Sequence, residues 1–100
     1  MPRESALQKR ILDYLSARGA YAKKFQAGPF SGSGKSDIWA CYRGRFIVIE
    51  VKRPGEIERG LTKVQAANLR KVHEAGGLAI VADSLSPVMT LLWEVDKSLE

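Results

Sequence analysis

Residues 45–52 read RFIVIEVK, and this stretch decides the expected fold. Successive side chains on a strand point to opposite faces, so alternate residues share a face. One face then carries Phe46, Val48, Glu50 and Lys52, and the other carries Ile47, Ile49 and Val51. Because both faces are largely apolar, the stretch predicts a central strand that is covered on both sides.

The residues just before this strand predict a hairpin. Residues 37–42 read DIWACY, and Arg43-Gly44 forms a compact connection to the strand that follows. Alternation places Asp37, Trp39 and Cys41 on one face of the new strand. A small, weakly polar residue inside a strand is typical of a core, so Cys41 is expected to be buried.

The N-terminal part of the chain predicts a helix, a strand and a loop. Residues 4–18 carry apolar side chains at helical spacing, and Gly19 is a plausible stop. Residues 20–25, AYAKKF, form a candidate strand. Glycine, serine and proline dominate residues 28–36, which are typical of a mobile loop.

The C-terminal half predicts a helix, a strand and a last helix. A turn and polar loop over residues 53–61 precede Thr62, which is positioned to cap a helix over 63–75. Gly76-Gly77 ends that helix, and LAIVA at 78–82 is a short apolar strand. The last helix begins between Ser84 and Pro87 and carries the apolar residues Val88, Met89, Leu91, Leu92, Trp93 and Val95.

This order of elements predicts the fold class and the domain organisation. The sequence is read as a single domain over residues 1–100, in the order αβββαβα. A hairpin followed by a helix and a further strand implies an α/β fold, with a mixed sheet flanked by helices. The helix between the last two strands implies a crossover connection.

Charge and apolar composition limit the partners of the protein. The net charge is +5 and the pI is about 9.6, which favours a polyanionic partner, nucleic acid first. No apolar run approaches the ~18 residues of a membrane helix, and no signal-peptide h-region is seen, so no membrane partner is expected. A single cysteine fits a reducing, cytoplasmic compartment.

Two acidic residues fall where the predicted hairpin brings them together. Asp37 begins one strand, and Glu50 lies near the end of its antiparallel neighbour. Two carboxylates held close resist simultaneous ionisation unless a cation sits between them. Magnesium prefers oxygen ligands, usually one or two carboxylates with waters, and the Val51 carbonyl could add one more.

Lys52 shares the strand face of Glu50 and completes a possible catalytic set. A lysine there could orient or deprotonate an attacking water, or neutralise charge in a transition state. Such parts suit metal-assisted hydrolysis of a phosphodiester. The tripeptide alone is weak evidence, because about 0.7 acid-x-lysine matches are expected by chance in a chain of this length. The alternative is a salt-bridged strand end at the surface.

The complete ordered set of motifs resembles the VRR-NUC domain of the PD-(D/E)XK nuclease superfamily, which has a restriction-endonuclease-like fold. The resemblance covers residues 4 to about 83, with Ser36 standing where proline is usual before the aspartate. The matching positions are Glu4, Gly34 to Asp37, Gly44-Arg45, Glu50-Val51-Lys52, Gln65 and Gly77 to Val81.

The resemblance implies DNA cleavage that depends on magnesium or manganese. It makes Asp37 and Glu50 metal ligands and Lys52 the catalytic lysine. Gln65 would lie on the helix over the site; its alternative is a solvated helix glutamine. Glu4 would reach the metal through water; its alternative is a first-turn acid favoured by the helix dipole.

Small members of this family, typically viral or bacterial, resemble homodimeric resolvases of four-way (Holliday) junctions. The resemblance thus implies a dimer acting on branched DNA, in a bacterial cytoplasm or a virus-infected cell. The last helix is a candidate dimer contact, because it carries Met89, Leu92 and Trp93. Lys35, Arg53 and Lys63 are the leading candidates for DNA contact, within a wider basic set that adds Lys23, Lys24, Arg43, Arg45 and Arg59.

Three other functions remain open from sequence. The chain could be a flap-type or general DNA nuclease. It could be a DNA-binding module with the same fold and no catalysis. It could also be a small structural protein, which would bind neither metal nor DNA.

Overall fold

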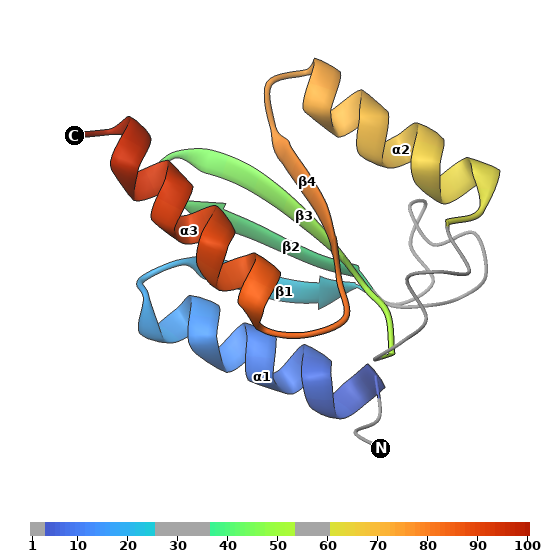
Figure 1. The fold of residues 1–100 in the computed structure, drawn as a ribbon, viewed down its shortest axis with the longest axis horizontal. Helices are drawn as coiled ribbons and strands as arrows, with labels where there is room; N and C mark the ends of the chain where they lie inside the picture. The colour runs from blue at the N-terminus through green and yellow to red at the C-terminus, as the bar shows by residue number, and fades with distance from the viewer. Residues whose placement is uncertain (1–3, 26–36, 54–60) are drawn as a thin grey trace.

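The computed structural model describes residues 4–25, 37–53 and 61–100. The elements follow the predicted order αβββαβα (Figure 1). They are α1 (Glu4–Ala17), β1 (Tyr21–Phe25), β2 (Asp37–Tyr42), β3 (Arg45–Val51), α2 (Lys63–Glu74), β4 (Leu78–Ala82) and α3 (Ser86–Ser98). The loop predicted over 28–36 and most of the turn predicted over 53–61 lie outside the described residues.

The strands form one mixed sheet in the order β1-β2-β3-β4. The first three strands are antiparallel, and β4 runs parallel to β3. All residues of β3 from Ile47 to Val51 are buried, which confirms the prediction of a central strand covered on both faces. The β2–β3 turn has positive φ at Arg43 (50°) and Gly44 (83°), as a two-residue hairpin matched to the strand twist requires.

The main core lies between one sheet face and the helices α1 and α3, which lie side by side over the strands (Figure 1). Alternate residues of β2 and β3 supply the sheet side of this core, together with the end of β4. They are Ile38, Ala40, Tyr42, Ile47, Ile49, Val51 and Ala82. No helix in the described ranges is long and apolar enough to cross a bilayer.

The opposite face of the sheet is covered only in part. The helix α2 packs against β4 and buries its own Val72, and Val48 of β3 is also buried on this face. A Cβ atom on Gly77 would lie 2.8 Å from Val72 Cγ1, so this close approach of helix and strand depends on glycine. Most of β1 and β2 stays exposed on this face, since α2 does not extend over them.

Two residues, Cys41 and Leu92, lie differently from the sequence-based expectations. Cys41 is exposed rather than buried, because it lies on the β2 half of the face that α2 does not reach. On α3, Leu92 is fully buried in the core, whereas Met89 and Trp93 are 47% and 60% exposed. Only the last two can therefore contribute to the predicted dimer contact.

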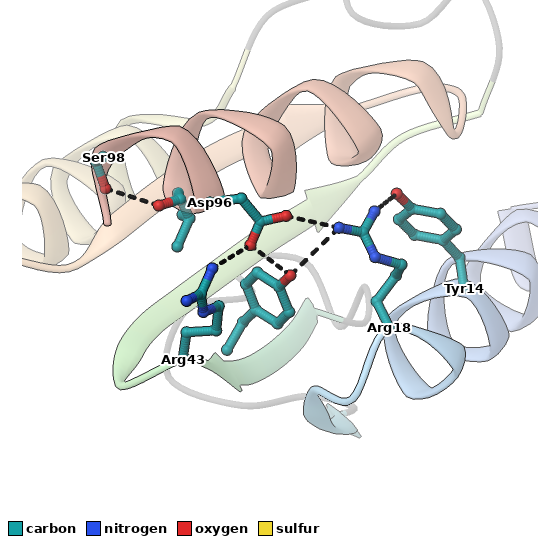
Figure 2. A network of polar contacts seen from close by, with 7 residues as sticks. Tyr14, Arg18, Arg43, Asp96 and Ser98 are labelled. Carbon is teal, nitrogen blue, oxygen red and sulfur yellow. Dashed lines mark hydrogen bonds and ion pairs between the residues drawn. The ribbon is translucent and has the colours of Figure 1, made fainter. Parts of the chain in front are cut away.

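A polar network joins both helices of the main core to the β2–β3 hairpin (Figure 2). Asp96 on α3 accepts from Tyr42 at 2.7 Å, and it forms ion pairs with Arg18 at 2.7 Å and Arg43 at 2.9 Å. Arg18, which directly follows α1, also donates to Tyr14 on that helix at 2.7 Å. The Tyr42 hydroxyl and then the Arg43 guanidinium hold the pKa of the Asp96 carboxyl below its ordinary value.

The lowered pKa of Asp96 predicts a loss of stability in acid. The unfolded chain takes up a proton near pH 3.9, before the folded protein does, so the stabilisation is present above that pH and is lost as the pH falls through the folded-state pKa. We expect Asp96→Asn to flatten this part of the stability profile, measured by urea unfolding between pH 2 and 6. Asp13→Asn is the matched surface control, and equal effects of the two changes would contradict the prediction.

Candidate active site

The β2–β3 register places the two predicted acidic residues directly opposite one another. Asp37 and Glu50 are Cα partners, at the end of the hairpin remote from its turn. Directly opposite residues of an antiparallel pair share a face, with Cβ atoms about 4.5–5.5 Å apart. The predicted adjacency is thus confirmed at the level of backbone register. The Asp37 side chain lies outside the described part of the structure.

Glu50, Lys52 and Gln65 form a buried polar cluster on this face. Their exposed fractions are 1%, 5% and 1%. Gln65 Nε2 donates to Glu50 Oε1 at 2.6 Å, and Lys52 Nζ lies 3.4 Å from Gln65 Oε1. The Lys52 ammonium is 3.9 Å from Glu50 Oε1. The glutamine on α2 therefore bridges the acid and the lysine of β3.

The first turn of α2 fixes the position of Gln65. Thr62 caps the helix as predicted: its Oγ1 accepts from the Gln65 backbone N–H at 3.1 Å. The Gln65 side chain returns the contact, because its Oε1 accepts from the Thr62 backbone N–H at 3.0 Å. This reciprocal capping box leaves the Gln65 amide little freedom to turn away from Glu50.

Burial of this cluster contradicts two alternatives that the sequence left open. A surface salt bridge would leave Glu50 and Lys52 solvated, and a solvated helix glutamine would leave Gln65 exposed, whereas all three are buried. Burying a charged group costs free energy unless it is paired and hydrogen-bonded. The cluster provides that pairing beside the Asp37 position.

The surroundings of Lys52 Nζ suit a charged ammonium group. Both of its described neighbours are oxygen acceptors, the Gln65 carbonyl oxygen and the Glu50 carboxylate. The Lys52 backbone N–H donates to Ala82 O at 2.9 Å, which extends the β3–β4 ladder past the end of β3. The backbone at Lys52 is thus held by the sheet, and its side chain is held from α2.

The donor set is compatible with magnesium. Within the described residues no three His, Cys, Asp or Glu side chains gather in one place. The predicted magnesium ligands include only two such side chains, the carboxylates of Asp37 and Glu50 on opposed strand positions. The third predicted ligand is the backbone carbonyl of Val51. One or two carboxylates with waters and a phosphate oxygen are the ligands that magnesium usually takes.

The remaining predicted residues are placed less completely. Glu4 begins α1, on the helix layer that covers the other sheet face, and its side chain lies outside the described part. Lys35 also lies outside the described residues. Arg53 and Lys63 are exposed; one follows Lys52 and the other begins α2. Their roles in catalysis or DNA contact stay predictions.

Two further features of the structure were not predicted from sequence. Gln8 is only 3% exposed although it is polar, and it lies one turn after Glu4 on α1. Its position between Leu7 and Ile11 on the apolar stripe was the available signal. The second feature is a cluster of aromatic rings from Phe25, Trp39 and Phe46, which lies on the Asp37 face.

Loss of the Gln65 side chain should destabilise the protein. We expect Gln65→Ala to lower the free energy of unfolding by about 1–3 kcal/mol, because buried groups of Glu50 and Lys52 lose their partner. The control is Val64→Ala on the same turn, where the side chain is 53% exposed. Urea unfolding at neutral pH measures both, and equal midpoints would argue against a structural role for Gln65.

Comparisons with family models, with curated proteins and with solved structures found no match to this chain.

Proposed function

We propose that the protein is a metal-dependent endonuclease that hydrolyses DNA phosphodiester bonds. The observation that carries this proposal is the buried cluster at the Asp37–Glu50 pair of strand positions. A carboxylate, an ammonium and a bridging amide are held there within 3.9 Å of one another. The resemblance to VRR-NUC nucleases agrees with it, and the net charge of +5 suits a polyanionic substrate.

Asp37, Glu50 and the Val51 carbonyl would hold a magnesium or manganese ion. When bound, such an ion polarises the phosphate and lowers the pKa of a coordinated water. Gln65 orients the Glu50 carboxylate through the 2.6 Å hydrogen bond to Oε1. Because Gln65 is itself fixed by the helix cap, the carboxylate needs no reorganisation to accept a ligand.

Lys52 would stabilise the negative charge that develops on the phosphate. Its ammonium lies beside Glu50 and already faces oxygen atoms, so a phosphate oxygen could replace one of these neighbours. A preformed positive charge in a buried site stabilises a transition state far more than one in water. Gln65 would act as a positioning residue for both side chains.

The reaction consumes one water molecule. The water oxygen forms a bond to phosphorus as one phosphorus–oxygen ester bond breaks. The attacking water loses a proton, and the departing sugar oxygen takes one up. The products are a phosphomonoester on one strand end and a hydroxyl on the other, with no change in oxidation state.

Branched DNA is the proposed substrate, with a four-way junction first. A homodimer related by a two-fold axis would match the near symmetry of such a junction. Met89 and Trp93 lie one turn apart on α3 and are 47% and 60% exposed, which supports this helix as the contact. Arg53 and Lys63 flank the site in sequence and would neutralise phosphates without reading bases.

The function is tested with labelled duplex, flap and four-way junction DNA, incubated with magnesium or with chelator. We expect cleavage only with the metal, preferentially of the junction, and none by Asp37→Asn. Cleavage that persists in chelator would refute the mechanism. Preference for flaps would favour a flap nuclease, and binding without cleavage would favour a non-catalytic module.

Salt provides a second test on the same DNA substrates. A site that neutralises several phosphates releases counterions on binding, so affinity should fall about 10³-fold or more between 50 and 200 mM salt. The measurement is equilibrium binding in chelator, which separates association from cleavage. A flat salt response would contradict recognition of the phosphate backbone.

A further inference from the structure

The uncovered half of the sheet presents aromatic side chains beside the candidate active site. Tyr21, Phe25 and Phe46 are 71%, 39% and 42% exposed, although they are large and apolar. The register puts Phe25 opposite Asp37, Tyr21 opposite Cys41, and Cys41 opposite Phe46. These side chains therefore share the sheet face of Glu50 and Lys52, at the part that α2 leaves open (Figure 1).

Trp39 forms the base of this aromatic patch. Its ring centroid is 4.4 Å from that of Phe25, at a tilt of 37°, and 5.7 Å from that of Phe46, edge to face. The Lys23 ammonium lies 5.5 Å from the Tyr21 ring centroid. Together with Cys41 these residues line an apolar groove of about 190 Å³.

Phe46 connects this groove to a second, basic one. The second groove has a volume of about 440 Å³ and lies between the β2–β3 hairpin and α2. Its lining includes Arg45, Phe46, Asn68 and Lys71. Among the described residues, no acidic side chain lines either groove. The open surface thus interleaves exposed rings with positive charge.

We propose that unpaired nucleobases stack on this aromatic patch, which we define as Tyr21, Phe25, Trp39 and Phe46. Proteins that bind single-stranded nucleic acid combine a basic groove for the backbone with aromatic rings for the bases. A second copy of this chain is a poorer occupant. A two-fold contact through this face would bring two positively charged surfaces together, since Lys23 and Lys71 line the two grooves and no described acidic side chain offsets them.

The patch adjoins the candidate active site, since Phe25 on β1 is the strand partner of Asp37. Trp39 lies two residues after Asp37 on the same face, a separation of about 7 Å. A base next to the phosphate held at Asp37 and Glu50 would come within reach of the rings. The inference rests on the proposed nuclease function and adds that nucleotides at the branch point of the bound DNA, next to the cut, are unpaired.

Two ten-residue oligonucleotides of equal charge isolate the contribution of the bases. One is oligodeoxythymidine, and the other is an abasic strand with the same phosphates. Binding is measured in chelator, so no cleavage is needed. We expect thymidine to bind at least about fivefold more tightly than the abasic strand, as stacking of even one base predicts.

Variants locate the base contact on the protein. We expect Tyr21→Ala combined with Phe46→Ala to lower thymidine affinity to the abasic level, while Tyr21→Phe retains it. Leu99→Ala is the control, since this apolar side chain is 45% exposed and follows α3, outside the patch. In a Trp93→Phe background, Trp39 fluorescence should be quenched by thymidine and unchanged by the abasic strand. Tyr21→Ala alone serves if the double variant does not fold.

Three results would overturn the inference. The first is equal affinity of the protein for the thymidine and abasic oligonucleotides. The second is wild-type affinity for thymidine in the Tyr21→Ala and Phe46→Ala variants. The third is loss of a dimer in those variants, with no preference for thymidine over the abasic strand. The last result would assign the patch to a second copy. Base-dependent binding without cleavage would refute the nuclease alone, whereas junction cleavage with base-independent binding would refute the stacking alone.

Discussion

Replacement of Glu50 by glutamine is expected to abolish metal-dependent cleavage while the chain remains folded. A glutamine side chain has the same shape and can still accept the 2.6 Å hydrogen bond from Gln65 Nε2. It cannot provide the negative charge that attracts a divalent cation. Loss of outer contacts to a metal ligand already costs about 10–100-fold, so loss of the ligand itself should reduce cleavage by at least about 100-fold.

Metal affinity gives the matching physical measurement for Glu50→Gln. Titration calorimetry with manganese should show binding to the wild-type protein and none to the variant. Circular dichroism checks the fold, because Lys52 loses its described counter-charge at 3.9 Å. Glu94→Gln, an exposed glutamate on α3, is the control. Undiminished cleavage by folded Glu50→Gln would rule out this site as the metal centre.

Replacement of Lys52 by methionine should remove cleavage but keep the metal site. Methionine fills a similar volume in a position that is 5% exposed, so packing is largely preserved. Without the ammonium, charge on the phosphate in the transition state is no longer stabilised. We expect the cleavage rate to fall by about 10²–10³-fold, as when one preorganised donor is removed from an active site.

The two site variants should therefore differ in their metal affinity. Lys52→Met removes a positive charge beside Glu50, so manganese should bind at least as tightly as in the wild-type protein. Lys9→Met is the surface control, because its ammonium contacts Asp13 in an exposed pair on α1. If Lys52→Met lost both metal binding and cleavage, Lys52 would be a structural support for Glu50 instead of a catalytic group.

Local sequence patterns were sufficient to predict the elements of this fold. The two-residue Arg43-Gly44 connection fixes the hairpin register, which in turn sets Asp37 opposite Glu50. Two-sided apolarity identified β3 as central, and Thr62 marked the start of α2. Each of these signals acts over a few residues, so it can be read without knowledge of tertiary contacts.

Burial could not be predicted in the same way, because it depends on where the helices pack. The sequence gives no measure of how far α2 extends across the sheet, so Cys41 was wrongly expected in the core. The same uncertainty left Gln65 open between solvated and buried positions. Its burial follows from the docking of α2 on β3 and β4, a contact between segments distant along the chain.

Gln65 has both a structural role and a role in the candidate active site, so its presence alone does not indicate catalytic activity. Its side chain completes the start of a helix and also holds an acid and a lysine in place. A descendant protein that had lost catalysis would still gain from keeping this amide, since foldability alone would favour it. Retention of the Asp37 and Glu50 carboxylates would therefore indicate selection for activity more reliably than retention of Gln65.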